Sequence, residues 1–98
     1  MDIKIESNIS HNLSKHIDLI DKNASIMIKV TDKISIITQD HNFLLEETIS
    51  GDIKNTGTII INGYLFINIL KKLRGMIYLS TSQNILSVYN NNSKFTLP

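Results

Sequence analysis

The stretch that most constrains the fold covers residues 58–75, where the hydrophobic period changes halfway. After Thr58 come three consecutive isoleucines, a β-branched run that favours a strand covered on at least one face. Asn62 and Gly63 then break the strand, and asparagine is a good helix N-cap. From Tyr64 onward the apolar residues recur at helical spacing, which predicts one buried stripe: Leu65, Phe66, Ile69, Leu70 and Leu73. A strand therefore leads directly into an amphipathic helix.

The end of this predicted helix is basic. Lys71, Lys72 and Arg74 crowd its last turn, where cations complement the helix dipole. Gly75 can adopt the left-handed conformation that commonly follows a helix. The pattern predicts a helix with an apolar face toward the core and a basic face toward solvent.

The other segments are mostly short strands joined by polar turns. Alternating or continuous apolar residues predict strands at residues 2–6, 25–30, 34–38, 43–49, 76–81, 85–89 and 94–97. A first helix is expected over residues 9–21, with Ile9, Leu13, Ile17 and Ile20 on one face. Residues 50–57 are the longest polar stretch, and we expect them to form a connection between the two halves.

Each half of the chain thus reads as strand, helix and three strands, in units of about 1–50 and 57–98. Neither unit can bury its helix stripe alone, so the two should pack as a single domain over residues 1–98. Short turns favour sequential antiparallel pairing. The expected fold class is α+β, with two helices packed on antiparallel sheets.

Composition excludes several kinds of protein. The chain has no cysteine, which excludes disulfides, thiolate catalysis and zinc–thiolate sites. No apolar run approaches the roughly 20 residues of a membrane span, and the first residues do not resemble a signal peptide. We therefore expect a cytoplasmic protein. The net charge is +1, so any affinity for nucleic acid must come from where the cations lie.

The sequence offers no catalytic or metal-binding pattern. His11 and His16 are five residues apart on the predicted first helix, and His41 falls in a turn. Helical metal ligands favour a spacing of four. Glu46 and Glu47 are neighbours on a strand and point to opposite faces. The four glycines are too dispersed for a phosphate-binding loop. We expect a non-enzymatic protein with no cofactor and no metal.

Three segments resemble the bacterial DNA polymerase sliding clamp, the beta subunit of DNA polymerase III. Residues 31–40, TDKISIITQD, are similar to the clamp segment D-G-x-L-x-L-x-x-T-D. Residues 60–73 resemble its second helix, including a basic residue at Lys71, and residues 93–98 look like the strand that closes a clamp domain. The resemblance covers nearly the whole chain and best matches the first of the clamp's domains.

The resemblance implies a processivity factor for DNA replication. Clamp subunits close a ring around duplex DNA, with sheets outside and helices lining the hole. Lysines facing phosphates suit such a sliding contact, because it carries no base readout. Lys71 is the first DNA-binding candidate, followed by Lys72 and Arg74 on the same helix, and by Lys15 and Lys22 on the first helix. For each of them, a solvated helix surface is the alternative role.

The resemblance also implies protein partners. Phe95 and Leu97 lie on the closing strand, so we expect at least one of them at an interface with another clamp domain or subunit, with core packing as the alternative. The pocket that captures the replicative polymerase lies between two clamp domains that are absent from this chain, so polymerase binding would need those domains. No membrane partner is expected.

The chain also departs from the family pattern. Residues 21–25 are short where clamps have an arginine-containing loop that touches DNA, and Tyr64 and Leu65 stand where basic residues are common. These departures support an alternative function: a small protein-interaction module that keeps the fold, no longer binds DNA, and pairs with a partner through its edge strands.

Overall fold

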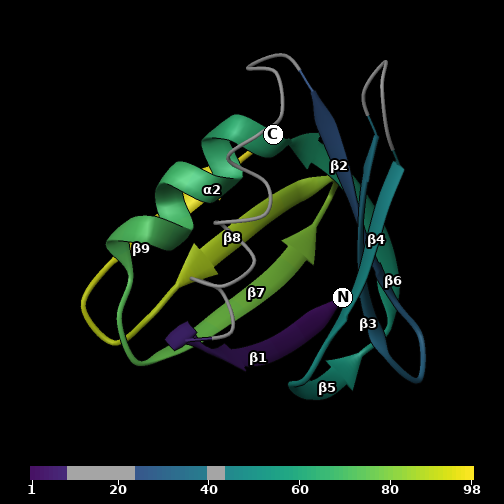
Figure 1. Cartoon of the computed structure of the whole chain (residues 1–98). Helices are drawn as coiled ribbons and strands as arrows, with labels where there is room; N and C mark the ends of the chain where they lie inside the picture. The colour runs from purple at the N-terminus through teal and green to yellow at the C-terminus, as the bar shows by residue number, and fades with distance from the viewer. Residues whose placement is uncertain (9–23, 40–43) are drawn as a thin grey trace.

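The computed structural model describes residues 1–8, 24–39 and 44–98 (Figure 1). Among these residues the structure has nine strands and the helix α2. In chain order they are β1 (Asp2–Glu6), β2 (Ser25–Val30), β3 (Ile34–Gln39), β4 (Leu44–Ile49), β5 (Asp52–Asn55), β6 (Gly57–Asn62), α2 (Gly63–Lys72), β7 (Met76–Ser82), β8 (Ile85–Tyr89) and β9 (Lys94–Leu97).

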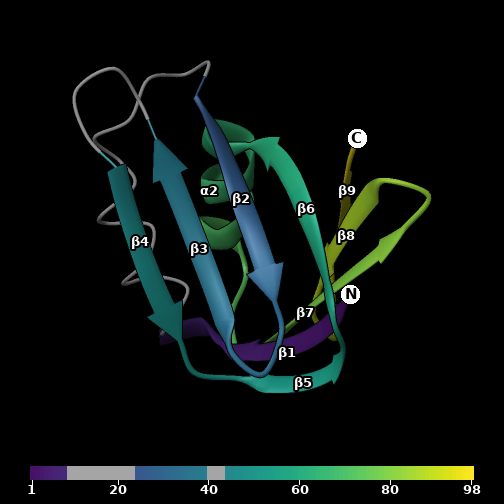
Figure 2. The ribbon, with the colours of Figure 1, turned by 90° about the vertical axis from the view of Figure 1, so that its right-hand side faces the viewer.

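The strands form two antiparallel sheets, and each sheet contains strands from both halves of the chain. One sheet has the order β5-β1-β7-β8-β9 and the other β4-β3-β2-β6. Sequential hairpins build β2-β3-β4 and β7-β8-β9, as the short turns predict. Three pairings remain. β1 pairs with β7 and β6 pairs with β2, which joins the two halves, and β5 pairs with the other side of β1. Figure 2 shows the four-stranded sheet face-on, with α2 behind it.

The hydrophobic core lies between the two sheets and α2. In β2 the alternate residues Ile26, Ile28 and Val30 are all buried, as expected for a strand with one face toward the core. Ile26 and Ile28 lie opposite Ile61 and Ile59 of β6. The other sheet contributes residues such as Ile3, Ile5, Ile77 and Leu79, which are buried at paired positions of β1 and β7. The α+β fold class is confirmed.

The polar connection predicted over residues 50–57 contains a strand that the sequence analysis did not predict. Asp52–Asn55 form the edge strand β5, which pairs with β1. The Lys4 ammonium lies 3.5 Å from the Asp52 carboxylate across this pairing. β5 has only one apolar residue, Ile53, so no alternation marks it in the sequence. Its strand conformation depends on the partner strand that the fold supplies.

Other boundaries differ less. β3 and β7 each extend one residue beyond the predicted end. The predicted turn between β7 and β8 is confirmed, and Gln83 and Asn84 there adopt φ values of 52° and 64°. The predicted helix over residues 9–21 and the turn before β4 lie outside the described residues. The division into two similar units, with two helices, stays a prediction.

Candidate nucleic-acid interface

The strand β6 passes into α2 through a side-chain cap. The Asn62 side-chain oxygen accepts a hydrogen bond of 2.9 Å from the Leu65 amide, which is otherwise without a helical partner. The predicted N-cap is therefore confirmed. Because β6 is paired with β2 up to Asn62, the cap fixes where the helix leaves the sheet.

The apolar face of α2 is rotated from its predicted position. Four of the five predicted residues are buried, and Leu70 is fully inaccessible: Phe66, Ile69, Leu70 and Leu73. Leu65, also predicted inside, is 48% exposed, whereas Ile67 is buried. Residues 66, 67 and 70 are neighbours on a helix surface, and position 65 lies at the far margin of that stripe. The prediction for Leu65 is wrong because helical spacing alone does not fix the centre of the stripe.

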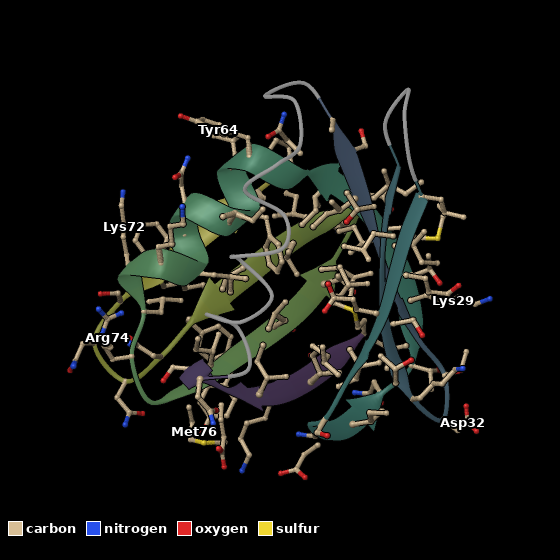
Figure 3. The ribbon with its side chains drawn as sticks, in the orientation of Figure 1. Lys29, Asp32, Tyr64, Lys72, Arg74 and Met76 are labelled. Atoms are coloured by element: carbon tan, nitrogen blue, oxygen red, sulfur yellow. The ribbon has the colours of Figure 1, made fainter. Side chains whose placement is uncertain are left out.

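The cationic end of α2, defined here as Lys71, Lys72 and Arg74, is exposed to solvent. Figure 3 shows Lys72 and Arg74 extending outward on the same side of the molecule, with Tyr64 at the opposite end of the helix. The sequence of α2 contains no acidic residue that would offset these charges. Lys71 and Lys72 lie in the last turn of α2 as predicted, but Arg74 does not, because the helix ends at Lys72 and Leu73 is extended.

Arg74 has a second role at this helix end. The helix ends at Lys72, and the Leu73 amide donates to the Leu70 carbonyl at 3.3 Å. The Arg74 Nη1 donates to the carbonyls of Lys71 at 3.1 Å and Leu73 at 3.2 Å. These carbonyls are among the last carbonyls of the helix, which have no partner within the α-helix itself. Arg74 therefore caps the helix through its guanidinium, while Lys71 and Lys72 extend from the last turn.

Gly75 has the predicted positive φ, at 79°. It lies two residues beyond the C-cap Leu73, whose backbone is extended. The left-handed residue thus turns the chain toward β7 rather than closing the helix itself.

The remaining predicted site residues are placed differently. Lys15 and Lys22 lie outside the described residues. β9 is an edge strand of the five-stranded sheet, as an interface would need. Within the chain, however, Leu97 is only 5% exposed and Phe95 is half-buried against the core. Their part in an interface stays a prediction.

A contact that the sequence analysis missed involves Asn90, in the loop between β8 and β9. Its side-chain nitrogen donates to the Arg74 carbonyl at 3.1 Å. The only sequence signal is the run of three asparagines, which indicates a turn but not a partner sixteen residues away.

The described part of the chain has neither a membrane-spanning helix nor a cluster of metal ligands. No helix there has the length and apolar character needed to cross a membrane. No group of three or more histidine, aspartate or glutamate side chains among those residues could hold a metal ion.

Comparison with known proteins gives one family. Residues 3–98 match the family model described as DNA polymerase III beta subunit, N-terminal domain. Comparison with curated protein sequences gave no match.

Solved beta clamps have the same fold. The Helicobacter pylori beta clamp in complex with carprofen superposes with a TM-score of 0.90 at 26% identity, covering 100% of this chain and 29% of that chain. The same clamp bound to a DNA ligase peptide gives 0.91 at 26% identity, covering 100% and 30%. Caulobacter crescentus pol III beta gives 0.88 at 20% identity, covering 100% and 29%.

This chain therefore spans less than a third of the length of the clamps that it matches. The match begins within β1 and runs to the last residue, and it includes the strand, cap and helix that form the cationic end of α2. The chain belongs to the family of DNA polymerase III beta subunit N-terminal domains.

Proposed function

We propose that this chain is a non-catalytic sliding-clamp domain that contacts the backbone of duplex DNA through the cationic end of α2. The observation that carries the proposal is the exposure of Lys71 and Lys72 on a helix whose opposite face is buried in the core. Lysines at such a position attract phosphates without reading bases. A sliding contact needs that property, because it must be equally strong at every position along the duplex.

The three cations do not have equal parts in this proposal. Lys71 and Lys72 face phosphates directly or through water, since their side chains extend from the exposed last turn. Arg74 adds charge, but its guanidinium also holds the helix end. Lys15 and Lys22 belong to the proposal by resemblance to the family alone.

The proposed partners follow from the same family. The edge strand β9 would pair with another clamp domain or subunit and so extend the five-stranded sheet, because an edge strand has unpaired backbone groups on one side. Contacts with the replicative polymerase would depend on clamp domains beyond the region covered by this chain.

The proposal is tested by comparing two double variants in binding to a short duplex. K71A/K72A removes two charges from the cationic end of α2. K29A/K33A removes two exposed charges from β2 and the following turn, and Figure 3 places Lys29 on the side away from Lys72. If two phosphate contacts are lost, the negative slope of log affinity against log salt should become shallower by about 1.8 in K71A/K72A. The melting temperature should stay unchanged.

The control decides how a loss of affinity is interpreted. The K29A/K33A variant should bind DNA nearly as the unchanged protein does. Equal losses in both variants would show that only net charge matters and would contradict a contact at α2. A lower melting temperature with unchanged DNA affinity in K71A/K72A would show that the lysines serve only the helix end.

A second function is favoured by the other end of the same helix. Tyr64 and Leu65 are 44% and 48% exposed, at positions where clamps often carry basic residues. An apolar surface there suits a protein partner better than phosphates. If neither double variant changes DNA binding, a protein-interaction module that uses this fold becomes the better explanation.

A further inference from the structure

The loop between β8 and β9 is organised around one asparagine side chain. The Asn90 side-chain oxygen accepts hydrogen bonds from the amides of Asn92 at 2.9 Å and Ser93 at 2.8 Å. The Asn90 amide donates to the Ser93 carbonyl at 3.0 Å. The loop therefore fixes the orientation of the Asn90 side chain, including the direction of its nitrogen.

That nitrogen connects the loop to the end of α2. It donates to the Arg74 carbonyl at 3.1 Å, across sixteen residues of sequence. The Arg74 guanidinium in turn donates to the carbonyls of Lys71 and Leu73. A continuous series of hydrogen bonds thus runs from the residues just before β9 to the last turn of α2, and α2 also packs against β9.

We propose that Asn90 is a positioning residue that holds the cationic end of α2 and the edge strand β9 as one unit. This inference rests on the proposed function, in which α2 meets DNA. Lysine side chains have many rotamers, so the direction of the last helical turn decides where their charges lie. Asn90 fixes the carbonyl of Arg74, the residue that caps this turn. A partner that binds along β9 would therefore act on the same unit as the DNA-facing charges.

The variant N90D isolates this link. Aspartate keeps the oxygen that accepts from Asn92 and Ser93, but it replaces the donor nitrogen with an oxygen facing the Arg74 carbonyl. The variant N91D is the matched control, because it adds the same charge to the exposed neighbouring residue of the loop. Any purely electrostatic effect on DNA binding should appear in both variants.

Two readouts test the inference. In the absence of DNA, hydrogen exchange at the Leu73 amide should become faster in N90D and stay unchanged in N91D, because the last turn of α2 loses its support. With a short duplex at low salt, N90D should weaken binding about three- to tenfold more than N91D does. Equal affinities with unchanged exchange at Leu73 would overturn the inference.

The outcomes separate this inference from the proposed function. Faster exchange in N90D would support the structural link even if K71A/K72A leaves DNA binding intact, in which case the proposed DNA contact fails. Normal exchange in N90D, together with weaker DNA binding in K71A/K72A, would overturn the role of Asn90 and leave the proposed function in place.

Discussion

Asp2 and Ser80 lie opposite each other in the pairing of β1 with β7, and the Ser80 hydroxyl donates a hydrogen bond to the Asp2 carboxylate. The other carboxylate oxygen accepts from the side-chain nitrogen of Asn55 on β5. One side chain therefore links three strands of the five-stranded sheet. The Ser80 hydrogen bond, followed by that of Asn55, lowers the pKa of Asp2 below its ordinary value.

This lowered pKa predicts a contribution of Asp2 to stability that depends on pH. The unfolded chain binds the Asp2 proton more tightly than the folded chain does, so the contribution is present above the unfolded pKa of about 4. It is lost as pH falls through the lower, folded pKa. Denaturant unfolding at about pH 7 and about pH 3 should show a smaller loss of stability for D2N than for the unchanged protein. D32N, in the β2–β3 turn, is the control and should lose as much stability between these pH values as the unchanged protein does. If D2N also loses as much as the unchanged protein, Asp2 does not have this role.

The link made by Asp2 illustrates what the sequence could not predict about the fold. The alternation of apolar and polar residues predicted the bounds of strands such as β2, because successive side chains of a strand point to opposite faces of the sheet. It could not show that β1 would pair with β7, since no local pattern encodes a partner 70 or more residues away. β5 was missed for the same reason, because its one apolar residue becomes part of a sheet only when β1 lies beside it.

The observed position of the buried face of α2 predicts that leucine-to-alanine substitutions at positions 70 and 65 have unequal effects on stability. Leu70 is fully buried, and L70A should lower the free energy of unfolding by about 2–5 kcal/mol through lost burial and a cavity. Leu65 is 48% exposed, so L65A should cost less than about 1 kcal/mol. Chemical denaturation of both variants measures the difference. Similar costs would show that Leu65 belongs to the buried stripe after all.

Gly51 lies in the connection between β4 and β5 and is closely packed against β1. Any side chain at this position should therefore lower the stability of the protein. A Cβ atom there would lie 2.7 Å from the Lys4 carbonyl oxygen and 2.8 Å from the Ile5 side chain. G51A should therefore cost about 1–3 kcal/mol of stability, because β1 must shift. Gly75 provides the contrast: its φ is positive but the space around it is open. G75N should cost under about 1 kcal/mol, since asparagine tolerates the left-handed region. Thermal unfolding of the two variants tests this order.

The candidate site was predictable only in part. Lys71, Lys72 and Arg74 are consecutive or nearly so, and their place at a helix end follows from local pattern. The different roles of the three residues cannot be predicted from that local pattern. Arg74 reaches back to two carbonyls, and Asn90 supports it from another loop. Such hydrogen bonds depend on the direction of the chain after α2, which the tertiary structure sets.

This division of roles predicts that Arg74 contributes to stability where Lys72 does not. R74A removes the donor to the Lys71 and Leu73 carbonyls and should lower the free energy of unfolding by about 0.5–1.5 kcal/mol. K72A removes an exposed side chain and should change stability by less than about 0.5 kcal/mol. Both variants lose one charge, so the helix dipole affects them similarly and cannot explain a difference. Equal stabilities in urea denaturation would mean that the guanidinium does not cap α2. Arg74 would then have the same proposed role as Lys71 and Lys72, which is to contact DNA.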